Sequence, residues 1–306
     1  MIWLIVSAII FFQVVVIVAL VFFRGSGRQN LKPASTTTPN SVGKYYNETT
    51  DKFLKVYGEI IQAFRTKDVK EYLDYTIKSA RFKDGMKLLD AGCGVAGPAI
   101  HFAQQLPNVS IEACTISAVQ AKMAEEKIIS SGLQKRVRVM EGDYHLLDSV
   151  VEKNSFDCVY FLESFGHSND KTKVFDTAWE VLKPGGMIYI KDLFRREVSD
   201  EWEQLRINSI CEQINSSYHY QIEDLNDVLS IIRKKGYILH FVKIPEVELS
   251  AFEQLSISND FQNLFNIGKI ESWDDYVFPI DFFEILAEKP IYNLNKDKHL
   301  YFMNQK

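Results

Sequence analysis

One stretch decides the fold class of this chain, and it reads Leu88-Leu89-Asp90-Ala91-Gly92-Cys93-Gly94-Val95-Ala96-Gly97-Pro98. An apolar run, predicted as a buried strand, ends in an acid and a glycine-rich turn. Glycine has no Cβ, so Gly92 and Gly94 let the backbone approach a nucleotide-like cofactor, and Gly97 allows close packing. Asp90 is left at the end of the strand, facing that ligand. The same loop also fits a dinucleotide-binding site or a glycine cluster without function, so the loop alone leaves the cofactor open.

Strands and helices alternate through most of the chain. This pattern is typical of an α/β protein with a doubly wound, mostly parallel sheet, which binds its ligand at the carboxyl ends of the strands. We expect strands at 86–91, 109–115, 136–141, 156–162, 186–193, 237–243 and 299–303, and helices at 97–106, 117–131, 171–183 and 222–235.

The amino-terminal residues 2–23 are apolar apart from Ser7 and Gln13. A helix of that length crosses a bilayer core of about 30 Å, so we predict one transmembrane helix. A cleaved signal peptide is the alternative, but the segment lacks a positively charged start and a small-residue cleavage site. Basic side chains follow the segment and none precedes it, which predicts a single-pass membrane protein with its large domain facing the cytosol.

The residues after this segment are rich in Ser, Thr, Asn, Gly and Pro, which indicates a flexible tether. The predicted organisation is therefore a transmembrane anchor at 1–23, a flexible tether at 24–41 and one α/β domain at 42–306.

The composition narrows the possible partners. With 306 residues, 46% of them hydrophobic, the chain can bury one large core. A net charge of −5 without any run of basic residues argues against a nucleic-acid partner. The cysteines fall singly, which predicts buried, reduced thiols and no metal site. They are Cys93, Cys114, Cys158 and Cys211.

Asp90 stands two residues before Gly92, and this placement resembles the first motif of class I S-adenosylmethionine-dependent methyltransferases. In that family the acid helps to hold the methionine amino group of the cofactor, whereas NAD-binding loops normally carry apolar residues there. The resemblance implies that Asp90, Gly92 and Gly94 bind S-adenosyl-L-methionine. It also implies a Rossmann-like methyltransferase fold with seven strands, in which the last strand lies antiparallel beside the sixth.

The second predicted strand ends in Thr115-Ile116-Ser117-Ala118-Val119-Gln120. This string resembles the second motif of geranyl diphosphate C-methyltransferases and cyclopropane fatty acid synthases, which carry Thr-Leu-Ser and a Gln in place of a ribose-binding acid. It implies that Thr115, Ser117 and Gln120 share the ribose and methionine end of the cofactor. Glu112 is a further candidate that ranks below Thr115. The alternative for Ser117 is that it caps the next helix.

The third predicted strand ends in Glu141-Gly142-Asp143-Tyr144. By the same resemblance, Asp143 accepts a hydrogen bond from the adenine amino group and Tyr144 packs on the adenine ring. An acid after a strand is also a common turn former, and that alternative stays open.

We expect the chemistry after the fourth strand, in Phe161-Leu162-Glu163-Ser164-Phe165-Gly166-His167-Ser168. This segment resembles the Glu-Ser or Glu-Ala segment of sterol and prenyl C-methyltransferases. Methylation of an alkene carbon makes a carbocation, which a carboxylate and aromatic faces stabilise before a base removes a proton. We predict Glu163 for that role and His167 as the second catalytic residue. The alternatives are that Glu163 binds the cofactor or caps a helix, and that His167 is an exposed loop residue.

The segment 44–59 resembles the one before the sheet in sterol, tocopherol and prenyl methyltransferases, where paired tyrosines close over cofactor and substrate. Tyr45 and Tyr46 are therefore predicted lid residues. Aromatic residues are dense in the helical cap insertions predicted at about 196–220 and 245–297, which favours an apolar acceptor pocket lined by residues such as Trp273 and the loop residue Phe165. Such residues also fit a homodimer surface or a membrane contact.

The resulting hypothesis is a membrane-anchored S-adenosylmethionine-dependent methyltransferase that methylates a lipophilic small molecule, most plausibly at a carbon of an isoprenoid or sterol-like acceptor. One alternative keeps the cofactor and methylates oxygen or nitrogen of a small metabolite. A second is a non-catalytic, membrane-tethered binding protein with the same fold, and an NAD-dependent enzyme ranks last.

Overall fold

The computed structural model describes residues 37–60, 68–246 and 277–292. All of them belong to one compact unit that begins at Thr36.

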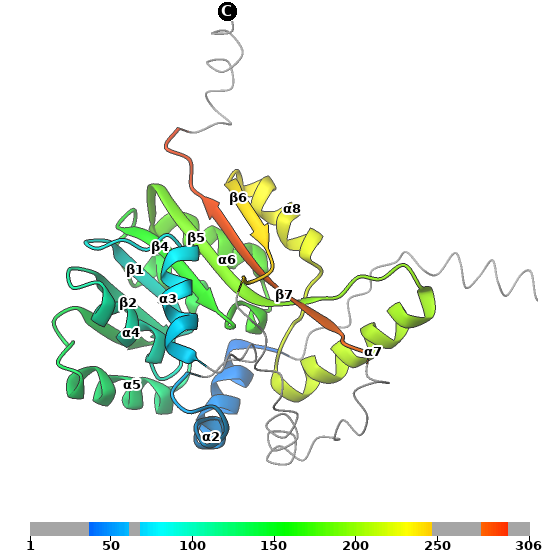
Figure 1. Cartoon of the computed structure of the whole chain (residues 1–306), viewed down its shortest axis with the longest axis horizontal. Helices are drawn as coiled ribbons and strands as arrows, with labels where there is room; N and C mark the ends of the chain where they lie inside the picture. Colours follow the sequence, from blue (N-terminus) through cyan, green and yellow to red (C-terminus); the bar gives the residue numbers. More distant parts are fainter. Residues whose placement is uncertain (1–36, 61–67, 247–276, 293–306) are drawn as a thin grey trace, which may run out of the picture. The chain divides into compact units, whose positions relative to one another are not determined.

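Seven strands in this part of the chain form one sheet, in the order β3-β2-β1-β4-β5-β7-β6 (Figure 1). Strands β1 to β5 pair in parallel, whereas β7 runs antiparallel to both β5 and β6. The predicted α/β class and the seven-stranded, mostly parallel sheet are confirmed. The strands are β1 (Lys87–Ala91), β2 (Ser110–Thr115), β3 (Val137–Glu141), β4 (Phe156–Leu162), β5 (Leu182–Arg195), β6 (Ile238–Lys243) and β7 (Ile280–Glu288).

Helices cover both faces of the sheet. Successive strand residues point to opposite faces, so Leu88 and Leu89 of β1 belong to separate cores. Leu88 packs with α3, α4 and α5, whereas Leu89 packs with α6 and α8. The described helices are α2 (Pro39–Tyr57), α3 (Val69–Ser79), α4 (Gly97–Gln105), α5 (Ala118–Ser130), α6 (Lys171–Val181), α7 (Glu201–Tyr218) and α8 (Leu225–Lys235), with short 3₁₀ turns η2 (Tyr144–Ser149) and η3 (Phe165–His167).

The strand order reverses at β1. Its neighbours β2 and β3 lie on one side, and β4 and β5 lie on the other. Ligands of doubly wound sheets bind in the crevice at this position, outside the carboxyl ends of the strands. The topology therefore places the glycine loop after β1 and the segment after β4 beside the same crevice.

The last strand lies elsewhere than predicted. The predicted strand at 299–303 lies outside the described residues, and β7 instead occupies Ile280–Glu288, within the stretch predicted as a cap insertion. It pairs with β5 from Met187–Glu288 to Arg195–Ile280. Phe282 and Phe283, which the sequence interpretation assigned to the cap, are strand residues that pack on opposite faces of the sheet.

The predicted tether ends earlier than expected, because α2 begins at Pro39. Thr38 and Ser41 form a capping box in which each side chain accepts a hydrogen bond from the other residue's backbone N–H, at 3.1 Å and 2.9 Å. Proline at the first position of the helix adds to this start signal. Residues 24–36 of the predicted tether lie outside the described residues.

The predicted membrane placement requires a correction. Across residues 37–292, with the two gaps noted above, no helix combines the length and the apolar character that spanning a bilayer requires. The segment 2–23, on which the single-pass and cytosol-facing placement depended, lies outside the described residues. The membrane placement is therefore withdrawn.

Candidate functional site

A pocket lies at the carboxyl ends of β1 and β4, where the strand order reverses. Its wall combines the glycine loop, the ends of β2, β3 and β4, and residues of α2 and α3. Most of the predicted site residues line it, namely Tyr46, Asp90, Gly92, Gly94, Thr115, Gln120, Asp143, Tyr144, Glu163 and His167.

The glycine loop has left-handed backbone at Gly92 (φ +101°) and Gly94 (φ +55°). A Cβ on Gly94 would meet no atom within 4 Å, which agrees with the prediction of an open approach for a ligand. A Cβ on Gly92 would lie 2.3 Å from the Cβ of Ser164. Gly92 is therefore needed for the close contact between the β1 and β4 loops, which differs from the sequence interpretation that it clears space for the cofactor.

These two glycines allow a matched test. We expect Gly92→Ala to lower the free energy of unfolding by about 3 kcal/mol, since it adds a clash to left-handed strain. Gly94→Ala adds only the strain and should cost about 1 kcal/mol. Urea unfolding followed by circular dichroism measures both. Equal losses in the two variants would contradict the packing role of Gly92.

Asp90 is a buried acid in the pocket wall, with 3% of its surface exposed. Burial raises the pKa of its carboxyl to about 7. No ion pair to Asp90 is found within the described residues. A buried carboxyl without a cationic partner favours binding of a cationic group from a ligand.

Residues at the end of β2 and directly after it form hydrogen bonds with one another, and two of them line the pocket. The Thr115 hydroxyl donates to Oε1 of Gln120 at 2.8 Å, and both residues face the pocket. Ser117 caps α5 by accepting the backbone N–H of Gln120 at 3.1 Å, and its hydroxyl donates to Asn47 of α2 at 2.7 Å. The helix-cap alternative for Ser117 therefore describes its contacts, and Ser117 is not among the pocket-lining residues.

Glu112, the lower-ranked ribose candidate, lies away from the pocket. Its carboxylate forms an ion pair with Lys87 at 2.8 Å. Glu112 sits three residues before the end of β2, so the pocket wall begins only at Thr115.

Asp143 lines the pocket and uses one of its two carboxylate oxygens for hydrogen bonds within the protein. Its Oδ1 accepts hydrogen bonds from the backbone N–H of His145 at 2.9 Å and from Nδ1 of the same histidine at 2.6 Å. Within the part of the chain that is described, no protein hydrogen bond ends on Oδ2. Asp143 is thus both a turn former and a pocket residue with acceptor capacity left for a ligand.

Glu163 directly follows β4 and has left-handed backbone at φ +55°. This conformation costs a non-glycine residue about 1–3 kcal/mol and is held here by backbone bonds on both sides. Its N–H donates to the carbonyl of Lys191 at 2.8 Å, and its own carbonyl accepts from the Tyr220 hydroxyl at 2.7 Å. The turn directs the side chain into the pocket wall.

The Glu163 carboxylate forms a buried ion pair with Lys191 of β5. Lys191 is fully buried, and its ammonium lies 5.2 Å from the ring centre of Tyr72 and 5.3 Å from that of Phe282. Burial lowers the pKa of Lys191, and Glu163 opposes that shift. The negative charge predicted for the acceptor site is therefore compensated within the protein.

His167 is buried, not exposed, and it is linked to Tyr46 of α2. Its Nδ1 lies 2.9 Å from the carbonyl oxygen of His219, which can only accept, so Nδ1 carries the proton. Its Nε2 then accepts the hydroxyl proton of Tyr46, at 2.7 Å. Burial lowers the pKa of His167 to about 3, so the imidazole is neutral at physiological pH.

Two predicted acceptor-side residues within the described part of the chain do not line the pocket. Phe165 turns away from it into the core, with its ring 5.8 Å from that of Phe161 and 5.7 Å from that of Phe175. Tyr45 packs against Phe53 beside the pocket. Trp273 lies outside the described residues.

The family model described as mycolic acid cyclopropane synthetase matches residues 65–228, more than half of the chain, including β1 to β5 and the pocket loops. The chain belongs to this family. The predicted relationship to class I S-adenosylmethionine-dependent methyltransferases and the predicted cofactor are thereby confirmed.

Individual relatives share only a low sequence identity with this chain. The sterol 24-C-methyltransferase ERG6B of Gibberella zeae is 26% identical over 226 residues, covering 71% of this chain and 56% of the relative. The chain spans about half the length of the curated relatives it matches.

Solved structures share the fold. Geranyl diphosphate C-methyltransferase from Streptomyces coelicolor A3(2), in complex with Mg²⁺, geranyl diphosphate and S-adenosyl-L-homocysteine, aligns with a TM-score of 0.59 and 16% identity over 84% of this chain and 100% of that one. The [4+2]-cyclase SpnF aligns with a TM-score of 0.64 and 19% identity over 83% of this chain and 98% of that one. Since a fold hosts different reactions, the reaction must be argued from the site.

The pocket of this family member fits S-adenosylmethionine. A cofactor with a cationic amino group, a ribose and an adenine needs an unpaired acid, polar groups at the end of β2 and an acceptor beyond β3. Asp90, the Thr115–Gln120 pair and Oδ2 of Asp143 meet these three needs from three adjacent strand ends.

Sequence reasoning missed Lys191, His145 and Asn47. Lys191 stands next to Asp192 in an otherwise apolar central strand, and a buried charge there requires a partner, so the strand itself contained a usable signal. Asn47 and the contact of His145 with Ser168 carry no such signal, because the partners Ser117 and Ser168 lie in segments distant in sequence.

Proposed function

We propose that this protein transfers the methyl group of S-adenosylmethionine to a carbon atom of a neutral, lipophilic acceptor of the isoprenoid or sterol kind. The observation that carries the proposal is the Glu163–Lys191 ion pair in a pocket that also has apolar and aromatic walls. Because Lys191 offsets the charge of Glu163, this carboxylate attracts a cationic acceptor only weakly, which favours a neutral acceptor. The apolar wall residues include Val42, Ile60, Tyr72, Leu73 and Leu162.

Bound S-adenosylmethionine supplies an electrophilic methyl group on a sulfonium. Asp90 would hold its amino group, Thr115 and Gln120 its ribose, and Asp143 its adenine. The electron pair of an acceptor alkene forms the new C–C bond as the C–S bond breaks, which leaves a cation on the acceptor. The face of Tyr72 stabilises that cation in a site where little water screens it, and the Glu163 carboxylate, whose charge Lys191 offsets, adds a smaller attraction.

The Tyr46–His167 pair suits the removal of a proton from this cation. The Tyr46 oxygen takes the proton as its own hydroxyl proton passes to Nε2 of His167, and the electron pair of the broken C–H bond restores the alkene. A carbocation is a very strong acid, so a histidine with its pKa lowered to about 3 is basic enough. An alcohol or ammonium acceptor would require a much stronger base, which favours carbon as the methylated atom.

The cofactor half of the proposal predicts a pH dependence. Burial raises the pKa of Asp90 to about 7, and a bound ammonium group requires the ionised carboxylate. The affinity for S-adenosylhomocysteine should therefore fall as the pH is lowered through 7, approaching about tenfold per pH unit. Calorimetric titrations in buffers set to pH values between 5.5 and 8.5 measure this change of affinity with pH. Asp90→Asn should bind more weakly and lose the slope, whereas an unchanged slope in that variant would contradict the assignment.

The acceptor half is tested by incubating the full chain with methyl-labelled S-adenosylmethionine and a total lipid extract. Label in the organic phase supports a lipophilic acceptor, and NMR of the product then locates the methyl group on carbon, oxygen or nitrogen. Label confined to the aqueous phase would contradict the proposal. Absence of transfer despite cofactor binding would favour the non-catalytic alternative.

A further inference from the structure

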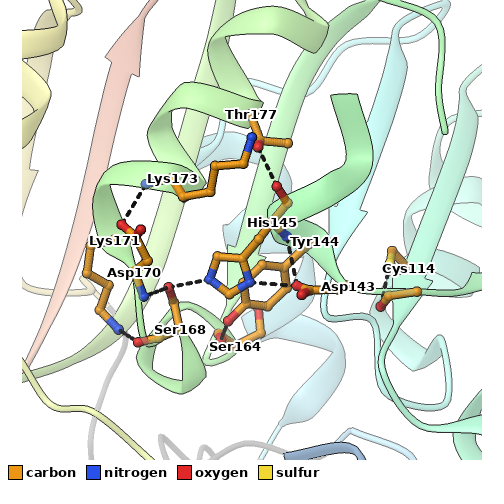
Figure 2. Close-up of polar contacts among 11 residues, drawn as sticks. Cys114, Asp143, Tyr144, His145, Ser164, Ser168, Asp170, Lys171, Lys173 and Thr177 are labelled. Carbon is orange, nitrogen blue, oxygen red and sulfur yellow. Dashed lines mark hydrogen bonds and ion pairs between the residues drawn. The ribbon is translucent and has the colours of Figure 1, made fainter. Parts of the chain in front are cut away.

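Two segments that serve opposite ends of the pocket are joined by a pair of hydrogen bonds (Figure 2). The segment 143–145 follows β3 at the cofactor end, and the loop 164–168 follows Glu163 at the acceptor end. The Tyr144 hydroxyl donates to the carbonyl of Ser164 at 3.1 Å. Nε2 of His145 lies 2.7 Å from the hydroxyl of Ser168.

The protons of the His145 bridge can be assigned from its neighbours. Nδ1 must donate, because Asp143 offers it a carboxylate oxygen at 2.6 Å. Nε2 of the neutral ring is then an acceptor for the hydroxyl proton of Ser168. The Ser168 oxygen in turn accepts the backbone N–H of Asp170 at 3.1 Å. In this arrangement each hydrogen bond from Oδ1 of Asp143 to the N–H of Asp170 has one donor and one acceptor.

This Asp-His-Ser order has the residue types of a nucleophilic triad, but it is not arranged for that chemistry. Ser168 is fully buried and does not line the pocket. Its hydroxyl is held by both His145 and the N–H of Asp170. A nucleophile must reach a substrate atom, so the bridge has a positional role.

The bridge ends next to groups that touch the two ligands. Asp143 lines the pocket, and within the described residues no protein hydrogen bond ends on its Oδ2. Ser168 directly follows His167, whose Nε2 accepts the Tyr46 hydroxyl proton. The buried ammonium of Lys171 donates to the carbonyls of Phe165 at 2.9 Å and Ser168 at 2.8 Å, which ties the loop into one unit. A shift of Ser168 is therefore transmitted to His167.

We infer that His145 is a positioning residue that couples cofactor binding at Asp143 to the ordering of the loop 164–168 and of the Tyr46–His167 pair. The inference rests on the cofactor half of the proposed function. When a ligand on Oδ2 fixes the Asp143 carboxylate, His145 and Ser168 lose freedom with it. Because such coupling is reciprocal, an ordered loop also strengthens cofactor binding.

Two substitutions at one position separate the halves of the bridge. The amide nitrogen of His145→Asn replaces the Nδ1 donor to Asp143 but leaves Ser168 without its acceptor. The longer His145→Gln places its amide oxygen near Ser168 and loses the bond to Asp143. Ser168→Ala removes the far end of the bridge together with the acceptor of the Asp170 N–H. Thr177→Val is the matched control, because it removes a 2.8 Å hydrogen bond to the carbonyl of His145 without touching the bridge.

Hydrogen exchange with and without S-adenosylhomocysteine gives a readout that needs no acceptor. In the wild-type chain and in Thr177→Val, the ligand should slow exchange in both 143–145 and 164–168. In His145→Asn and Ser168→Ala, it should slow exchange in 143–145 only, with affinity within about threefold of wild type. His145→Gln should bind about tenfold more weakly, as expected for one lost hydrogen bond to a charged group.

The outcomes separate this inference from the proposed function. A wild-type chain that does not bind S-adenosylhomocysteine would overturn both. Ligand-induced slowing at 164–168 that persists in His145→Asn and Ser168→Ala would overturn the coupling alone. Slowing at 143–145 but not at 164–168 in the wild-type chain and in Thr177→Val would show that the bridge only packs the fold, and would also overturn the coupling.

Discussion

Replacing Lys191 with methionine should lower the free energy of unfolding by about 3–5 kcal/mol, because the substitution leaves the Glu163 carboxylate buried without its cation. Glu163 has 5% of its side chain exposed and Lys191 has none, so water cannot take over the role of the partner. Equilibrium urea unfolding, with the slope checked against that of the wild type, measures the loss.

The double variant Lys191→Met with Glu163→Gln is the control for this prediction. It removes both charges and keeps similar volumes, so it should recover most of the lost stability. A double variant as unstable as Lys191→Met would show that the methylene packing of Lys191, and not the ion pair, carries the effect. The double variant should still bind S-adenosylhomocysteine, because neither side chain belongs to the group that fits the cofactor.

Tyr46→Phe should lower the rate of methyl transfer by about 10²–10⁴-fold, the range expected when a positioned proton-transfer group is lost. The substitution removes the hydroxyl that bonds Nε2 of His167 and keeps the aromatic ring. The affinity for S-adenosylhomocysteine should stay near that of the wild type. Initial rates of label transfer into the lipid extract, at saturating S-adenosylmethionine, measure the first quantity, and calorimetry measures the second.

Tyr45→Phe is the matched control on the same helix. Tyr45 precedes Tyr46 in the sequence, and its ring packs edge-on against that of Tyr46 with the ring centres 5.2 Å apart. Tyr45 does not line the pocket. Its variant should retain most of the activity. Equal losses in the two variants would mean that the hydroxyls stabilise α2, and the proton-transfer role of Tyr46 would then be wrong.

The electrostatic character of the site depends on which of its ionisable side chains have a partner of opposite charge. Glu163 is compensated by Lys191, and His167 is neutral because burial lowers its pKa to about 3. Asp90 is buried without an ion-pair partner within the described residues, and its pKa rises to about 7. A cation is therefore favoured at the cofactor end of the pocket and a neutral group at the acceptor end.

Short-range patterns were the reliable part of the sequence interpretation. The strand that ends at Asp90, the turn through Gly94 and the helix that begins at Gly97 depend on neighbouring residues, and the structure has them as expected. The last strand was misplaced, because a strand buried on both faces lacks the alternation that identifies a strand in sequence. The aromatic pair Phe282–Phe283 was read as part of a cap for this reason.

The sequence by itself determined the fold class, the position of the cofactor loop and most residues of the pocket, since these follow from backbone conformation and from the meeting of strand ends at one edge of a sheet. Only the tertiary structure decided the charge and proton states of the site. The partners Glu163–Lys191, Tyr46–His167 and His145–Ser168 are 28, 121 and 23 residues apart in the chain. The first contact arises from the pairing of β4 with β5, the second from the docking of α2 over the pocket, and the third joins the turn η2 to the loop before α6. No local pattern encodes these approaches.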